Sequence, residues 1–326
     1  MSTIVPVWLW GVFVGIVVLA LILDFVVLRK QGAHDVTVKE AVNWSIVWVA
    51  LSVAFMGLLW WAVRDGTGST ELANTKALEF ITGYLIEKSL AVDNIFVFLM
   101  IFTYFAVPSA FQKRVLMIGI IGAIVLRTVM ILVGGLLIAK FHWVLYLFGV
   151  FLLVTGIKMW WAAGQEPDLE SNPALKLLRK IMPVSKQFDG EKFFTIENGK
   201  RIATPMLLVI ALVGMTDVIF AVDSIPAIFA ITSDPFIVLT SNIFAILGLR
   251  AMYFLLSAMA SKFHLLSYGL ALVLVFIGTK MILIDVIKIP VLISLGVVIG
   301  ILAVTMIMSV RTAPKLKAGE QLDTQG

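Results

Sequence analysis

Long hydrophobic runs alternate with short polar connections from one end of the chain to the other. About 20 consecutive apolar residues are enough to cross a bilayer as a helix. The runs predict nine such spans, at 7–28, 42–63, 77–105, 115–138, 143–161, 204–231, 236–258, 265–287 and 291–310. The pattern therefore predicts an all-α polytopic membrane protein, with the lipid bilayer as its first partner.

One connection differs from the others. Residues 162–203 are polar, carry three prolines and hold most of the loop charge. The chain therefore divides into five spans (1–161), a soluble loop (162–203), four spans (204–310) and a polar tail (311–326). The loop is the place where a protein partner would bind.

Composition agrees with this picture and excludes several classes of protein. Hydrophobic residues make up 61% of the 326 residues and charged residues 14%, against about 25% charged in a soluble domain. There is no Cys, so disulfides and thiolate metal sites are excluded. The net charge of +5 comes from loop residues that set topology, so we expect no nucleic-acid partner. No nucleotide-binding or redox-cofactor motif is found, and we expect neither an enzyme nor a permanently bound cofactor.

Basic residues in the loops predict the orientation. Sixteen lie on the side of the loop 162–203, and four lie on the other side, namely Arg64, Lys76, Lys140 and Lys288. Because positive loops stay in the cytoplasm, the amino terminus is expected outside and the long loop and carboxyl terminus inside.

Two short stretches inside the spans carry charges that are costly at membrane depth. Glu87 is followed by Asp93 and Asn94, and Asp217 by Asp223 and Ser224, each pair of acids being six positions apart. A charge there costs about 3 kcal/mol on the insertion scale. A spacing of six covers roughly 240° of a helix, so both acids can face one point only where the helix is broken, which Pro226 would permit. The simpler alternative is a pair of buried polar contacts between helices.

The stretches belong to a longer repeat. Lys140-Phe141-His142 and Gly156-x-Lys158-Met159 recur as Lys262-Phe263-His264 and Gly278-x-Lys280-Met281, at an offset of 122. Spans three to five are therefore predicted to recur as spans six to eight. Because three is an odd number, the two copies enter the membrane from opposite faces, as in transporters built from inverted repeats.

These stretches, together with the run 241–254 (Ser-Asn-Ile-Phe-Ala-Ile-Leu-Gly-Leu-Arg-Ala-Met-Tyr-Phe), resemble the TerC family of integral membrane proteins, most closely its Alx members. The resemblance covers nearly the whole chain. It implies a bacterial inner-membrane protein of the LysE-type transporter superfamily. It also implies an association with tellurium resistance and, for several members, manganese export.

Hard oxygen ligands dominate the predicted site. The candidate metal ligands are Glu87, Asp93, Asn94, Asp217, Asp223, Ser224 and Asn242. Sites made only of oxygen suit Mg²⁺, Ca²⁺ or Mn²⁺, whereas His and Cys select zinc and copper. Met215 could bias the site toward a transition metal or simply fill a gap in the core. We expect a transported divalent cation, Mn²⁺ above all, and protons as the exchanged ion.

Two arginines fall at equivalent places in the repeat. Arg127 and Arg250 could neutralise the empty acidic site, or they could form purely structural ion pairs. Asp24 could extend the acidic path or face the cytoplasm, and Lys158 and Lys280 are expected to reach the interface.

Two functions of different class follow from these features. The first is a secondary transporter that exports a divalent metal cation through the buried carboxylates. The second is a membrane scaffold or stress-resistance protein that recruits partners through residues 162–203, with a role in tellurium resistance or redox modulation. The repeat and the buried acids favour transport, since a scaffold needs neither.

Overall fold

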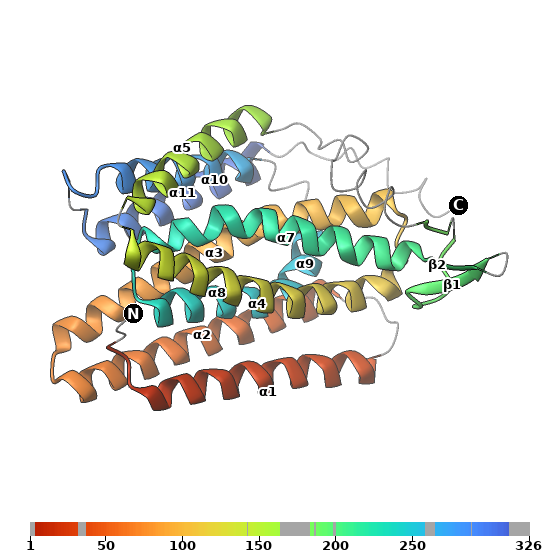
Figure 1. Cartoon of the computed structure of the whole chain (residues 1–326), viewed down its shortest axis with the longest axis horizontal. Helices are drawn as coiled ribbons and strands as arrows, with labels where there is room; N and C mark the ends of the chain where they lie inside the picture. Colours follow the sequence, from red (N-terminus) through yellow and green to blue (C-terminus); the bar gives the residue numbers. More distant parts are fainter. Residues whose placement is uncertain are drawn as a thin grey trace.

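The protein is an elongated bundle of helices with a small β-hairpin at one end (Figure 1). The computed structural model describes residues 4–31, 37–141, 143–163, 183–185, 187–197, 200–257, 265–287 and 289–312. Much of the predicted loop and nearly all of the predicted tail lie outside these residues. The helices are α1 (Val7–Gln31), α2 (Val38–Thr67), α3 (Thr70–Tyr104), α4 (Ser109–Lys140), α5 (Val144–Ala162), α7 (Pro205–Phe229), α8 (Pro235–Leu247), α9 (Leu249–Ser257), α10 (Leu266–Ile282) and α11 (Val291–Thr312).

Apolar side chains on the outer helices point away from the bundle. Leu136 of α4 is 62% exposed and Val154 of α5 is 58% exposed. By contrast, every residue of α8 is buried. Exposure of so much apolar surface would be unfavourable in water, whereas it is favourable against the hydrocarbon tails of lipids. The fold is thus an all-α polytopic membrane protein.

Six of the described helices are long and apolar enough to cross a membrane, or seven if α8 and α9 form one bent span. Helix α3 carries several charged side chains, and α10 has only 17 residues. The count of nine spans therefore stays a prediction.

The seventh predicted span, 236–258, is not one straight helix. The chain bends by 45° between α8 and α9, at Gly248, whose N–H donates to the carbonyl of Ile246. The bend at Gly248 was not expected, and the break that the spacing of the motif acids would require is absent. Helix α7 continues through Pro226, and α3 is continuous through Glu87. Pro226 lies in the last turn of α7, where one lost hydrogen bond is easily tolerated.

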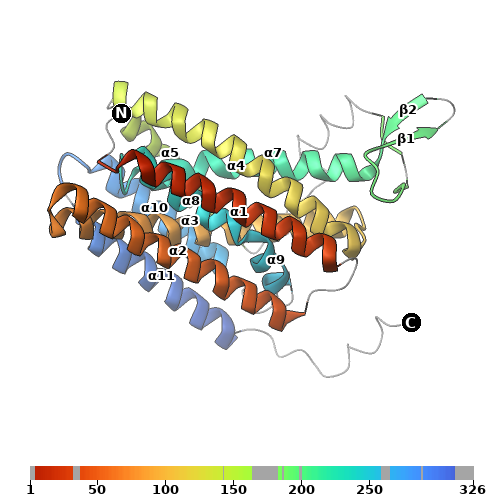
Figure 2. The ribbon, with the colours of Figure 1, turned by 90° about the horizontal axis from the view of Figure 1, so that it is seen from below.

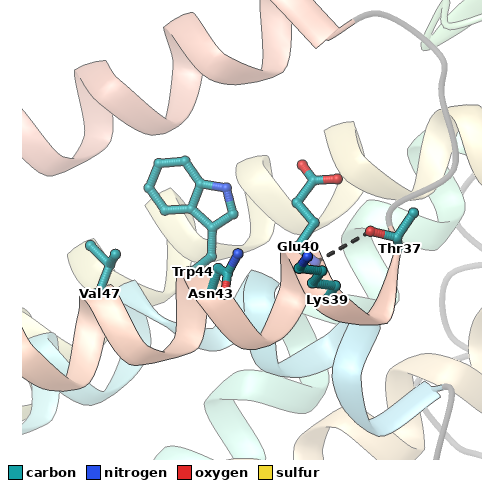
Figure 3. A pocket seen from close by; sticks show the side chains of 6 residues that line it. All are labelled: Thr37, Lys39, Glu40, Asn43, Trp44 and Val47. Carbon is teal, nitrogen blue, oxygen red and sulfur yellow. Dashed lines mark hydrogen bonds between the residues drawn. The ribbon is translucent and has the colours of Figure 1, made fainter.

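Helix ends show how local sequence sets the elements. Thr37 caps α2 by accepting a hydrogen bond from the backbone N–H of Glu40 (Figure 3). Gly68 ends α2 at φ 69°, in the left-handed region that glycine adopts without strain. Asp234 caps α8 through the N–H of Phe236, and Pro235 occupies the first turn, where a missing N–H costs nothing.

Part of the predicted loop is an ordered hairpin. Strands β1 (Phe194–Glu197) and β2 (Lys200–Ala203) pair antiparallel, with Phe194 opposite Ala203. Thr204 joins the hairpin to α7, because its Oγ1 donates to the carbonyl of Lys192 at 2.6 Å. The hairpin lies beyond the amino-terminal end of α7 and projects away from the bundle (Figure 2).

Candidate metal site

Arg127 of α4 is the centre of a buried polar cluster between four helices. Only 1% of this residue is exposed. Its Nη2 donates to Oδ1 of Asp217 at 2.9 Å, its Nε lies 3.4 Å from Oδ2 of the same carboxylate, and its Nη1 donates to Oε1 of Glu87. A guanidinium can bridge two carboxylates in this way because its donors are fixed in one plane.

Neutral side chains complete the cluster. Ser224 of α7 places its Oγ 3.4 Å from Nη1 of Arg127. Asn242 of α8 donates from Nδ2 to Oε2 of Glu87 at 3.0 Å. The two oxygens of Glu87 are therefore held by two different helices, α4 and α8.

Close packing of α3 on α8 makes the contact with Asn242 possible. A Cβ added at Gly83 of α3 would lie 2.8 Å from Oγ of Ser241. Only a residue without a side chain lets α8 come so near. Glu87 follows Gly83 by one helical turn, and Asn242 follows Ser241 by one residue, so the approach brings these two side chains together.

The cluster has an excess of negative charge and unused acceptors. Two carboxylates face one guanidinium. Two buried amide oxygens, Oδ1 of Asn94 and Oδ1 of Asn242, lack a hydrogen-bond donor within the described structure. Buried acceptors are almost always satisfied, so each exception requires a reason. Oxygens of this kind are suitable ligands for a hard cation.

A cavity of about 360 Å³ adjoins the cluster. Glu87, Asn94 and Ser224 reach it from α3 and α7, and Thr155 and Lys158 reach it from α5. Leu90, Met159, Ala162, Phe220 and Leu274 form its apolar wall. The cavity extends from Glu87 to Ala162 at the carboxyl end of α5, which is the end of that helix directed toward the hairpin (Figure 1).

A second pocket, at the start of α2, does not belong to this site. It measures about 330 Å³ and is lined by Thr37, Lys39, Glu40, Asn43, Trp44 and Val47 (Figure 3). Its lining includes none of the motif acids.

The structure brings together five of the predicted ligands: Glu87, Asn94, Asp217, Ser224 and Asn242. Asp93 and Asp223 lie in α3 and α7, but their side chains are outside the described part of the structure. Within that part, no three acidic or histidine side chains lie close enough together to hold a metal ion. The complete predicted ligand set therefore stays a proposal.

The second arginine has a different partner. Nη2 of Arg250 donates to Oδ1 of Asp24 at 2.5 Å, which joins α9 to α1. Although Arg127 and Arg250 occupy equivalent places in the predicted repeat, the structure gives them different environments.

The cavity-lining residues that were not predicted as ligands include three on α5 with a hydroxyl, an ammonium or a thioether: Thr155, Lys158 and Met159. The repeated Gly-x-Lys-Met motif contains two of them and could have indicated this position. The sequence analysis also predicts no role for Lys88, although this residue follows Glu87 directly. Its Nζ donates to the carbonyl of Ala245 at 3.1 Å.

Comparison with known proteins agrees with these features. A profile of the integral membrane protein TerC family matches residues 72–317. A candidate membrane-bound redox modulator from Salmonella typhi, named Alx, is 54% identical over 309 residues, which cover 95% of this chain and 96% of that protein. The Alx protein of Escherichia coli K12 is 53% identical over the same shares. An uncharacterized membrane protein of Myxococcus xanthus is 47% identical and covers 92% of this chain and 91% of its own length.

No solved structure matches the chain. The profile covers well over half of the sequence, and the relatives align along nearly all of it, so the resemblance seen in the motifs is confirmed. The chain belongs to the TerC family of integral membrane proteins.

Proposed function

We propose that this protein is a secondary transporter that exports a divalent metal cation, Mn²⁺ above all, in exchange for protons. The observation that carries the proposal is the buried pair Glu87 and Asp217, bridged by Arg127, with a cavity beside Glu87 that extends to the carboxyl end of α5. A purely structural ion pair needs neither the surplus carboxylate nor the unused amide oxygens beside it.

Charge balance indicates how a cation would be held and released. Glu87 and Asp217 carry one negative charge beyond what Arg127 neutralises, and Asp93 and Asp223 lie in the same two helices. Carboxylates that share a site take up protons more readily than isolated ones. Protons and a divalent cation therefore compete for the same oxygens, which is the basis of exchange.

Exchange also provides the driving force. Moving two charges outward against about 100 mV costs about 4.6 kcal/mol. Protons that enter down their gradient offset this cost. The preference for Mn²⁺ over other hard cations rests on the family resemblance, because the oxygen ligands alone do not select it.

The helix packing supports a transporter built from two related halves. Helix α3 packs against α8, α7 packs against α4, and α3 also packs against α7. Helices α5 and α10 cross closely, with Gly156 and Gly278 at the contact. These are the pairings that a two-fold arrangement of the predicted repeat requires, with the carboxylate cluster at its centre.

The protein is proposed to lie in a bacterial inner membrane, with its amino terminus outside and the hairpin and carboxyl terminus in the cytoplasm. The cavity then faces the cytoplasm, where an exporter must collect its substrate.

A second candidate function is a stress-related scaffold that recruits a protein partner through the loop 162–203. The hairpin favours it, since Ile196 is 75% exposed and Phe194 is 42% exposed, outside the bundle. The names of the Alx relatives also point to redox modulation.

Substitution of the acids separates the two functions. Asp93→Asn and Asp223→Asn are expected to abolish export while leaving membrane insertion intact, because an amide keeps the shape but loses the charge that compensates a cation. The measurement is the Mn²⁺ content of cells that express each variant, with Asp189→Asn in the exposed hairpin region as the matched control. Normal Mn²⁺ efflux in both variants would exclude the proposed site. Loss of function only on deletion within 183–203 would favour the scaffold.

A further inference from the structure

The carboxyl end of α8 lies inside the protein, where the chain bends toward α9 at Gly248. A helix that ends in a buried position leaves carbonyl oxygens without intrahelical donors and carries about half an elementary negative charge. In transporters, broken helix ends of this kind are places that hold a cation. The end of α8 is therefore expected to need positive charge.

Lys88 of α3 supplies it. Its Nζ donates to the carbonyl of Ala245, in the last turn of α8, at 3.1 Å. A Cβ added at Gly248 would lie 2.6 Å from this nitrogen and 3.1 Å from Cβ of Trp48. The ammonium is thus enclosed between the end of α8, the bend and α2.

The same helix is held at a second point nearby. Glu87 precedes Lys88 in α3 and accepts a hydrogen bond from Asn242 of α8. Two consecutive residues of α3 therefore fix α8, one inside the carboxylate cluster and the other at the helix end. A shift of the helix end would move Asn242 away from Glu87.

The charged groups on the surrounding helices have other partners. Glu87 and Asp217 bind Arg127, and Asp24 of α1 binds Arg250 of α9. Within the described part of the chain, no carboxylate forms an ion pair with Lys88, so the end of α8 serves as its counter-charge.

We propose that the bend between α8 and α9 is a monovalent-cation site that is permanently occupied by the ammonium of Lys88. Lys88 acts as a positioning residue: by neutralising the helix end, it holds Asn242 against Glu87. The consequence for metal export rests on the proposed function, whereas the cation site itself does not.

Removal of the side chain exposes the site. Lys88→Ala leaves a cavity next to the negative helix end, which methylammonium can fill and tetramethylammonium is too large to enter. Lys88→Met fills the space without charge. Lys280→Ala is the matched control, because Nζ of Lys280 donates to the hydroxyl of Ser294 at 2.9 Å and not to a helix end.

Thermal unfolding of the purified full-length protein, followed by its tryptophan fluorescence, tests the site directly. We expect Lys88→Ala to have a lower Tm than the native protein and to recover by about 2 °C or more in methylammonium chloride, but not in tetramethylammonium chloride at equal ionic strength. The native protein, Lys88→Met and Lys280→Ala should respond equally to both salts. An equal response of Lys88→Ala to both salts, or a native Tm in Lys88→Met, would overturn the proposal.

Glycine substitution tests the contact from the opposite side. Gly248→Ala should displace the ammonium without removing it. We therefore expect a lowered Tm that methylammonium does not restore. Gly122→Ala is the matched control, since a Cβ there meets nothing within 4 Å. A Tm for Gly248→Ala equal to that of Gly122→Ala would contradict the enclosed position of Lys88.

Mn²⁺ transport by reconstituted vesicles distinguishes this inference from the proposed function. Lys88→Ala should transport at least 10-fold more slowly than the native protein, and methylammonium should restore most of the rate. If the native protein moves no metal, the proposed function fails while the Tm response still decides the cation site. If the native protein and Lys88→Ala transport at the same rate, the positioning role is wrong.

Discussion

Arg127 binds two carboxylates from different halves of the chain, and this arrangement determines what the residue can do. Glu87 belongs to the first motif and Asp217 to the second. A buried guanidinium and carboxylate stabilise each other only when both are present, because an unpaired buried charge costs several kcal/mol. Arg127 is therefore expected to hold Glu87 and Asp217 together, because its loss would leave two buried carboxylates without a cationic partner.

Arg127→Gln should weaken metal binding in a pH-dependent way. Without the guanidinium, the two carboxylates lose a neutralising charge and favour the protonated form, so protons compete better with the metal near neutrality. We expect the Mn²⁺ affinity of the purified protein to fall at pH 7 and to recover at pH 8. Isothermal titration at pH 6, 7 and 8 measures this.

Arg250→Gln is the comparison, since Arg250 binds Asp24 and not the cluster. It should leave the Mn²⁺ affinity and its pH dependence unchanged. Tighter binding by Arg127→Gln at every pH would mean that the arginine repels the metal and does not hold the site open.

The sequence predicted the residues of this cluster better than their arrangement. The motif acids, their neutral neighbours and Arg127 were all identified as candidates. The spacing of seven from Glu87 to Asn94, and from Asp217 to Ser224, places each pair on one helix face, and it could have indicated that these pairs share the cluster. The partners of Arg127 and Arg250 could not be predicted, because they depend on how distant helices pack.

At the scale of elements, α8 and α9 show a second limit of prediction from sequence, because hydropathy does not indicate where a helix bends. The run from Phe236 to Ala258 is apolar throughout, so hydropathy predicts one straight span. The bend coincides with a tertiary contact at Gly248, where Lys88 and Trp48 occupy the space that a side chain would need. A single glycine in an apolar run does not reveal this. The proline in α7, a stronger signal in sequence, produces no break.

The contact between α5 and α10 depends on glycines that the repeat motif had singled out. A Cβ added at Gly278 would lie 2.6 Å from the backbone N of Leu153, and one at Gly156 would lie 2.8 Å from the carbonyl oxygen of Ala271. In a membrane, small residues let helices approach to backbone contact, and packing at that distance replaces the hydrophobic effect as the driving force.

Gly278→Ala and Gly156→Ala should each force the two helices apart. Because the obstacle is backbone and cannot turn aside, we expect a loss of about 1–3 kcal/mol, seen as a lower Tm in detergent. Gly296→Ala in α11 meets nothing within 4 Å and should keep the native Tm. Equal Tm values for all three variants would show that the contact between α5 and α10 is looser than the structure indicates.

At the scale of the whole molecule, the two ends of the bundle differ around the carboxylate cluster. On the hairpin side, the cavity leads from Glu87 to the end of α5. On the opposite side, a polar network joins the start of α3 to the connection between α7 and α8. Lys76 binds Glu79 at 2.8 Å, and Oγ1 of Thr232 donates to the same carboxylate at 2.6 Å. Helix α8, whose residues are all buried, begins at Pro235, directly after this network. The cavity and the polar network therefore lie at opposite ends of the bundle, with the carboxylate cluster between them.

Chemical labelling can test this asymmetry, because the native chain has no Cys and needs no background substitutions. A cysteine at Thr155, in the cavity, should react with a charged, membrane-impermeant thiol reagent in inverted membrane vesicles but not in intact spheroplasts. Lys192→Cys in the exposed hairpin region should behave in the same way. Thr75→Cys, exposed near the start of α3, should react only in spheroplasts. Ser52→Cys, a fully buried position within α2, should react in neither.

Comparison of the four variants shows whether the cavity contains water and from which side of the membrane it is reached. Reaction of Thr155→Cys with a charged reagent requires a path filled with water, and protection by Mn²⁺ would show that the cation shares this path. A failure of Thr155→Cys to react from either side, with Lys192→Cys reacting normally, would mean that lipid fills the cavity and that the site is reached by another route. Reaction of Lys192→Cys in spheroplasts would reverse the orientation. An exporter would then be open to the outside in this structure, with the polar network at Glu79 closing the cytoplasmic side.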